Sequence, residues 1–174
     1  MVPIEAIIKW ENNYPWANKK QVEQDLIISR ALVAIYNDDF LASRLAFRGE
    51  TALHKLYLSP QSSYSEDIDL VQIQSENIGA IIDKLREVLS FLGKPVIKQK
   101  KNNNTMVFRV VSTFPPVTPI RLKVEINCKE HFMDEKMQED VFLKDTQALL
   151  RPSLIFNPQV AYEVVRKELI EKIY

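Results

Sequence analysis

Two aspartates separated by one residue, Asp67 and Asp69, form the pattern in this sequence that is best suited to metal chemistry. Polar and apolar residues alternate over residues 67–74, which predicts a β-strand. Side chains two residues apart on a strand point to the same face, about 6 to 7 Å apart along it. Mg²⁺ binds through one or two such carboxylates together with substrate phosphates. The pattern alone is also typical of a solvated strand edge, so further features must distinguish the two interpretations.

A third carboxylate is expected from residues 120–127, the other segment that alternates strictly. Its residues divide into an apolar row and a charged row, which are Leu122, Val124 and Ile126 against Arg121, Lys123, Glu125 and Asn127. A carboxylate on a neighbouring strand would complete a two-metal site. Glu125 is therefore the candidate for the third acid.

A glycine turn precedes the two aspartates. Residues 44–48 predict a strand that runs into Gly49, and residues 51–58 predict a helix. Backbone N–H groups at a strand-to-helix turn bind phosphate, and Thr51 adds a hydroxyl. Lys55 lies one helical turn further along and is expected to reach a phosphate oxygen. An anion site beside a carboxylate cluster indicates phosphoryl or nucleotidyl transfer, in which charge neutralisation does most of the catalytic work.

Further helices and strands are expected to flank this centre. Apolar periodicity and turn residues predict a short helix within residues 1–16, a helix over 21–36, a helix over 78–92 with Ser75 as its N-cap and Gly93 as its stop, a hairpin of 96–100 with 105–112, and a last helix that starts at Asn157 and Pro158. We expect one α/β (α+β) domain over residues 1–174. It divides into leading helices (1–40), a catalytic core (44–127) and a helical tail (149–174).

Charge and hydropathy narrow the class of protein. The sequence has 23 basic and 23 acidic residues, so no overall field attracts nucleic acid or an anionic membrane. No apolar run is long enough to span a bilayer, and the first residues lack the pattern of a secretion signal. We therefore expect a soluble, cytoplasmic protein with no membrane partner.

The three segments together resemble the AbiEii/AbiGii toxin family of nucleotidyltransferases, a branch of the DNA polymerase β-type superfamily. The similarity lies in FRGETALHKLY (47–57), YSEDIDLV (64–71) and KVEIN (123–127), with VEQDLIISRAL (22–32) similar to the leading helix of the family. It covers about residues 10–127. The resemblance implies a small mixed sheet flanked by helices, Mg²⁺ or Mn²⁺, and transfer of a nucleotide from a nucleoside triphosphate to an RNA, such as tRNA, or a protein. Members that act as toxins are countered by a cognate antitoxin.

The resemblance also assigns roles to individual residues. The catalytic and metal-binding set is Asp67, Asp69 and Glu125, and the nucleotide-binding set is Gly49, Thr51, Lys55, Ser65 and Lys123. Within these sets, Glu125 is expected to bind metal or to activate the acceptor hydroxyl. Ser65 is expected to cap or brace the strand that bears the aspartates.

The sequence departs from the family pattern in three ways. Glu50 stands where the family has a second glycine, Ser63 stands where it has an arginine, and the larger helical region after the third acid is missing. A carboxylate beside the triphosphate repels it, and the lost arginine removes a phosphate contact. Two interpretations therefore remain: an active nucleotidyltransferase, which the three acids favour, and a degenerate, catalytically weak binding module with the same fold, which the departures favour.

Overall fold

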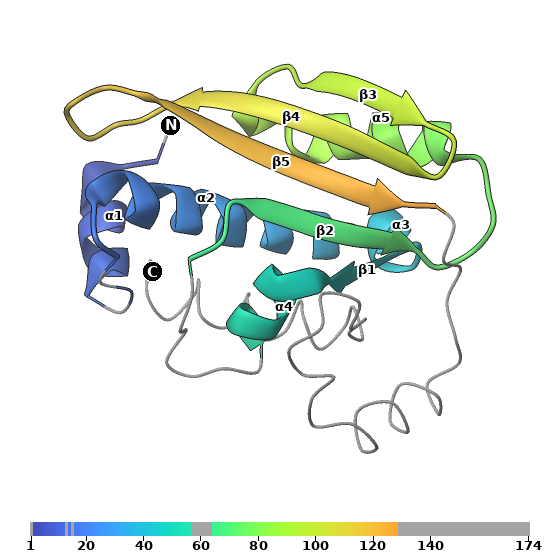
Figure 1. The fold of residues 1–174 in the computed structure, drawn as a ribbon, viewed down its shortest axis with the longest axis horizontal. Helices are drawn as coiled ribbons and strands as arrows, with labels where there is room; N and C mark the ends of the chain where they lie inside the picture. The colour runs from blue at the N-terminus through green and yellow to red at the C-terminus, as the bar shows by residue number, and fades with distance from the viewer. Residues whose placement is uncertain (1, 13, 15, 57–63, 129–174) are drawn as a thin grey trace.

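The computed structural model describes residues 2–12, 14, 16–56 and 64–128. Within these residues, five strands form one sheet in the order β1-β2-β5-β4-β3 (Figure 1). The strands are β1 (Leu45–Arg48), β2 (Asp67–Gln72), β3 (Val96–Lys100), β4 (Asn103–Val111) and β5 (Pro119–Asn127). β2 pairs with β5 in parallel, and the other neighbours are antiparallel. The sheet is therefore mixed, as the family resemblance implied.

Helices pack along one side of this sheet. They are α1 (Ile4–Glu11), α2 (Lys19–Tyr36), α3 (Asp39–Ala42), α4 (Gly49–Leu56) and α5 (Ile78–Val88), followed by the 3₁₀ helix η1 (Ser90–Leu92). α2 runs along the sheet and contacts β2, β5 and α5, whereas α4 lies beside β1 and β2 (Figure 1). The predicted fold class, a small mixed sheet flanked by helices, is confirmed. None of the helices in this part of the chain is long and apolar enough to cross a membrane.

The two faces of the sheet differ in chemistry. In β5 every second residue is fully buried and belongs to the core that α2 covers, and these residues are Ile120, Leu122, Val124 and Ile126. Between them, Arg121 is exposed, while Lys123 and Glu125 are half-buried. Alternation therefore places the charged side chains of β5 on the face opposite the apolar core, which we call the polar face.

A buried polar network joins α1, α2 and α4. Asp25 accepts hydrogen bonds from Trp10 Nε1 at 2.8 Å and from Lys55 Nζ at 3.0 Å, and Lys55 also donates to Ser29 Oγ at 2.9 Å. The Lys55 and Asp25 side chains are only 1% and 0% exposed. Charges buried this deeply are tolerated when they are paired and hydrogen-bonded, so the network fixes α4 against α2.

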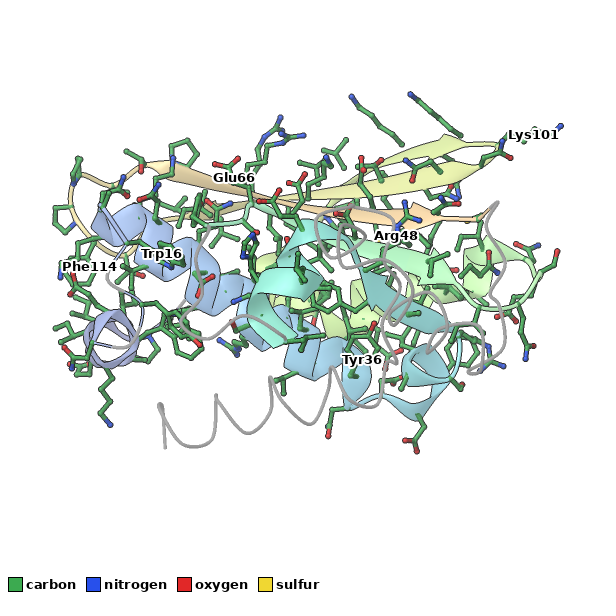
Figure 2. The ribbon with its side chains drawn as sticks, turned by 60° about the horizontal axis from the view of Figure 1, so that its bottom comes forward. Trp16, Tyr36, Arg48, Glu66, Lys101 and Phe114 are labelled. Carbon is green, nitrogen blue, oxygen red and sulfur yellow. The ribbon has the colours of Figure 1, made fainter. Side chains whose placement is uncertain are left out.

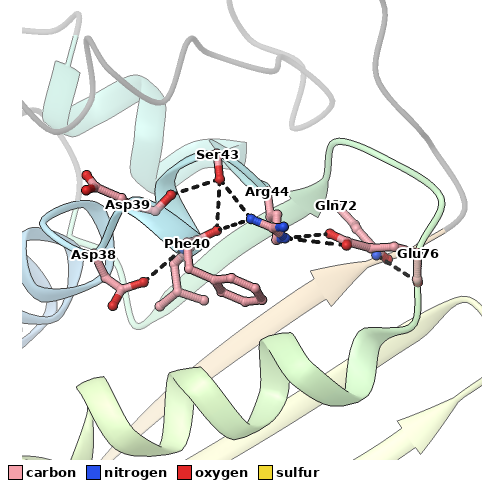
Figure 3. A network of polar contacts seen from close by, with 8 residues as sticks. Asp38, Asp39, Phe40, Ser43, Arg44, Gln72 and Glu76 are labelled. Carbon is pink, nitrogen blue, oxygen red and sulfur yellow. Dashed lines mark hydrogen bonds and ion pairs between the residues drawn. The ribbon is translucent and has the colours of Figure 1, made fainter.

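Arg44, directly before β1, holds the end of β2 near α3 (Figure 3). Its Nε lies 3.2 Å from Glu76 Oε1, and its Nη1 donates to the Phe40 carbonyl at 3.2 Å. The Arg44 carbonyl accepts from Ile73 N at 2.9 Å, just beyond the β1–β2 ladder. The contacts close the end of the ladder that lies away from Gly49.

Several predicted boundaries change. The prediction that Ser75 caps α5 is wrong, because the Asn77 side chain accepts a hydrogen bond from Gly79 N at 2.9 Å. α5 ends at Val88, and η1 follows it as far as Leu92. Gly93, which has φ +84°, comes directly after η1. The hairpin is confirmed, with β4 beginning at Asn103, two residues earlier than predicted. The predicted end of α4 after Leu56, Ser63 and the C-terminal helical tail lie outside the described residues.

We expect Lys55→Met to lower the free energy of unfolding by about 3 kcal/mol, because it leaves the Asp25 carboxylate buried without its cation. The double variant Asp25→Asn/Lys55→Met is expected to recover much of this loss, since it removes both charges. Urea titration of the variants measures the change, and Lys101→Met, the same change at an exposed position, is the control. A loss for Lys55→Met no larger than that for Lys101→Met contradicts the prediction.

Candidate active site

The register of β2 against β5 brings the three predicted acids together. Asp67 pairs with Lys123, and Asp69 pairs with Glu125. Because neighbouring residues in register lie on the same face, both aspartates and Glu125 share the polar face. The sequence predicted Glu125 on a neighbouring strand, and the structure places it directly beside Asp69.

Lys123 stands between two of the acids. Its Nζ lies 2.6 Å from Asp67 Oδ2 and 3.3 Å from Glu125 Oε1. The hydrogen bond to Asp67 is the main cause that raises the pKa of Lys123 above its ordinary value, partial burial opposes it, and Glu125 adds to it. The Lys123 ammonium is therefore a fixed positive charge at the centre of the carboxylate cluster.

The surroundings of Asp69 disfavour its ionisation. Burial raises the pKa of Asp69, and the nearby charges of Glu125 and Asp67 raise it further. The charges of Lys123 and Arg48 oppose this rise. A second cation at Asp69 would relieve the repulsion that Lys123 leaves in place.

Gly49 brings the start of α4 against this acid. It has φ +82°, a backbone conformation that favours glycine. A Cβ atom at Gly49 would lie 2.6 Å from Asp69 Oδ2 and 3.2 Å from Asp69 Cγ. Only a residue without a side chain fits this turn, so the glycine is needed for both its backbone angle and its contact with Asp69.

The other residues predicted to bind nucleotide have different surroundings. Thr51 Oγ1 donates to the Asp67 carbonyl at 2.8 Å, so it ties α4 to β2. The Lys55 ammonium belongs to the buried network around Asp25, and the phosphate contact predicted for it is replaced by these core partners. Ser65 is buried two residues before the start of β2. Gly49 and Lys123 therefore lie at the acid cluster. Thr51 and Lys55 instead hold α4 in position, against β2 and α2 respectively.

Glu50, the departure from the family turn, points along its own helix. Its Oε1 lies 3.4 Å from His54 Nε2, and its side chain is 64% exposed. The carboxylate thus has a partner one turn along α4. Its exposure keeps it solvated, which limits the repulsion that it exerts on a bound anion.

Arg48 is a site residue that sequence reasoning missed. It is the last residue of β1 and pairs in register with Asp69. Its positive charge opposes the rise in the pKa of Asp69. Figure 2 labels Arg48 and also Glu66, the residue before Asp67. Lys101 is labelled there as well and lies at the far end of the β3–β4 hairpin. The available signal was the position of Arg48 directly before Gly49 at the end of a strand that runs into the turn.

The donor set fits a hard divalent cation. No group of three or more His, Cys, Asp and Glu side chains within the described ranges is close enough to hold a metal ion by itself. Mg²⁺ does not require such a cage, because it keeps several waters and takes oxygens from substrate phosphates. Asp67, Asp69 and Glu125 supply oxygen ligands on two adjacent strands, and the Lys123 contacts show that this place attracts positive charge.

A family model described as "Nucleotidyl transferase AbiEii toxin, Type IV TA system" matches residues 30–153. The chain belongs to the AbiEii family. The matched span includes the Gly49 turn and all three acids, so it agrees with the family that the sequence motifs indicated. No curated protein matches the chain.

Three solved structures are similar to the chain at 20% sequence identity or less. JHP933 from Helicobacter pylori is 20% identical, with a TM-score of 0.49, and the match covers 68% of this chain and 48% of that one. A second H. pylori protein, titled a nucleotidyltransferase, is 17% identical (TM-score 0.45; 67% and 49% covered). MenT4, a nucleotidyltransferase toxin from Mycobacterium tuberculosis, is 15% identical (TM-score 0.45; 79% and 51% covered). The AbiEii-family chain therefore spans about half the length of each of these proteins.

We expect Asp69→Asn to stabilise the protein at neutral pH. Because the folded-state pKa of Asp69 is raised above 3.8, the folded protein loses stability as pH rises from 3.8 through the raised value. Asparagine carries no charge and avoids this loss, so its advantage should be full at pH 7 and disappear below about pH 4. Thermal unfolding across this range measures the difference. Asp83→Asn, at an exposed position on α5, is the control, and an advantage of Asp69→Asn that is independent of pH contradicts the prediction.

Gly49→Ala is expected to displace the Asp69 carboxylate, because the new methyl group occupies its place. Gly93→Ala is the matched control, since Gly93 has φ +84° and no atom within 4 Å of its added Cβ. Both variants should lose roughly 1 to 2 kcal/mol of stability from the positive φ. Only Gly49→Ala should lower the pKa of Asp69 toward its ordinary value, as read by NMR titration of the carboxyl carbon. An unchanged Asp69 titration in Gly49→Ala would refute the contact.

Proposed function

We propose that this AbiEii-family protein is a nucleotidyltransferase that depends on Mg²⁺ or Mn²⁺. It joins the nucleotide of a nucleoside triphosphate to an RNA acceptor such as tRNA, or to a protein: the bond between the α- and β-phosphates breaks and pyrophosphate leaves. The observation that carries the proposal is the contact of the Gly49 turn with Asp69, beside Asp67 and Glu125 on one face of the sheet. An anion-binding turn and a cluster of oxygen ligands at one place are what this reaction requires.

Each residue of the site has a role in this reaction. Asp67 and Asp69 would hold the metal, with Glu125 as a further oxygen ligand, and a bound metal would neutralise charge on the phosphates and on the leaving group. Gly49 lets the backbone approach the triphosphate at the start of α4, where the helix dipole favours negative charge. Arg48 adds a cation beside Asp69. Glu125 has two alternative roles: it would complete the metal site, or it would accept the proton of the acceptor hydroxyl.

Thr51 and Ser65 support the site from behind. Thr51 fixes the backbone of Asp67 relative to α4, and Ser65 is buried where the chain enters β2. The Lys55 network holds the far end of the same helix. Together these contacts maintain the distance between the phosphate turn and the carboxylates without touching the substrate.

We further propose that the protein is the toxin of a toxin–antitoxin or phage-defence pair, with a cognate antitoxin as its partner. The description of the matching family supports this proposal. Covalent modification of an RNA or protein by a nucleotide blocks that acceptor, which accounts for toxicity without any further activity.

A catalytically weak binding module is the second candidate. Two observations favour it: Lys123 already occupies two of the three acids, and Glu50 puts a negative charge in the phosphate-binding turn. In this case the site would bind nucleotide or a partner without transferring the nucleotide.

A transfer assay distinguishes the two candidates. The protein is incubated with each α-labelled nucleoside triphosphate, Mg²⁺ or Mn²⁺, and total tRNA or lysate. We expect labelled acceptor from the wild type and a loss of at least about a hundredfold in Asp67→Asn, which removes a carboxylate that would hold the metal. Asp83→Asn, exposed on α5, should keep full activity. Absence of labelling with all four triphosphates, combined with retained nucleotide binding, would favour the binding module.

A further inference from the structure

Lys123 has a more specific place than a general phosphate contact. Its ammonium lies within ion-pair distance of two carboxylates from two strands, Asp67 on β2 and Glu125 on its own strand. Its side chain is only 22% exposed, compared with 37% for Asp67 and 31% for Glu125. The positive charge is therefore held inside the carboxylate cluster and is not directed toward solvent.

The backbone determines this position. The parallel register places Lys123 directly opposite Asp67, and strand alternation places Glu125 two residues further on the same face. A lysine at this place has few ways to avoid the two acids. The 2.6 Å distance to Asp67 is that of a charge-assisted hydrogen bond.

We propose that Lys123 is a built-in counter-ion whose ammonium occupies the place of a metal ion between Asp67 and Glu125, so that lysine contact and metal binding exclude each other. This inference rests on the proposed function, because it concerns the same metal-binding acids. An oxygen that donates a lone pair to a metal cannot at the same time keep a short hydrogen bond to an ammonium in the same direction. Lys123 must therefore leave at least one carboxylate when the metal binds.

Two consequences follow for the protein. Without metal, Lys123 offsets part of the negative charge of Asp67 and Glu125 and so stabilises the sheet. With metal alone, the displaced ammonium has lost its partners, so metal binding is weakened by the cost of moving it. A triphosphate offers the ammonium new oxygen partners, and metal and nucleotide therefore bind cooperatively. The device lets the protein remain folded and inactive until both are present.

Removal of the Lys123 charge tests this inference. Mn²⁺ is titrated into wild type, Lys123→Met and Lys101→Met in the absence of nucleotide, and free Mn²⁺ is measured by electron paramagnetic resonance. Methionine keeps the apolar stem of lysine and removes its charge. We expect Lys123→Met to bind Mn²⁺ about tenfold more tightly than wild type, because no internal cation competes for the acids. Lys101→Met removes the same charge from the far end of the β3–β4 hairpin and should stay within about twofold of wild type.

Stability gives a second readout that does not depend on turnover. Without metal, Lys123→Met should have a lower melting temperature than wild type, because three carboxylates repel one another. Saturating Mn²⁺ should raise this temperature more in Lys123→Met than in wild type. Lys123→Gln, which can still donate a hydrogen bond to Asp67, is the second variant if the methionine side chain prevents folding.

The outcomes separate the inference from the proposed function. If both Lys123 variants bind Mn²⁺ as tightly as wild type or more weakly, the counter-ion inference is overturned. If Asp67→Asn abolishes the binding that wild type shows, the metal site itself is left intact. Absence of Mn²⁺ binding in wild type and in both variants overturns the metal site and the counter-ion together. Tighter binding in the Lys123 variants alone supports both.

Discussion

Parallel pairing of β2 with β5 decides which charged residues meet. It sets Asp67 against Lys123 and Asp69 against Glu125, and a shift of one residue would turn one strand's charged row toward the core. The register is held by the opposite face, where Ile68 and Val124 are fully buried and directly paired. The hydrophobic core therefore fixes the electrostatics of the site from the opposite face of the sheet.

The second constraint is the placement of α4, which is held at both ends. At its start, Gly49 contacts Asp69, and Thr51 binds the backbone of Asp67. At its far end, Lys55 is paired with Asp25 inside the core. An eight-residue helix has little stability of its own, so these contacts keep it in place. The buried charge is thus part of how the turn stays in position beside the acids.

Local patterns predicted most of this arrangement and missed its long-range contacts. Strict alternation over residues 120–127 was sufficient to assign faces, and the family motif located the turn and the acids. No local signal told whether Lys55 points to a phosphate or to Asp25, because 30 residues separate the two. The α5 cap was ambiguous for another reason. Ser75 and Asn77 are both capping residue types, so residue type alone does not tell which of them precedes the first helical turn.

The charges of the site also limit the order in which ligands bind. Asp67, Asp69 and Glu125 outnumber the two nearby cations, Lys123 and Arg48, by one charge. A polyanionic triphosphate therefore meets a site that is negative overall when no metal is bound. A divalent cation reverses that sign, so the triphosphate gains most when it arrives with metal. The raised pKa of Asp69 points the same way, because it marks the carboxylate whose charge the two resident cations leave least compensated.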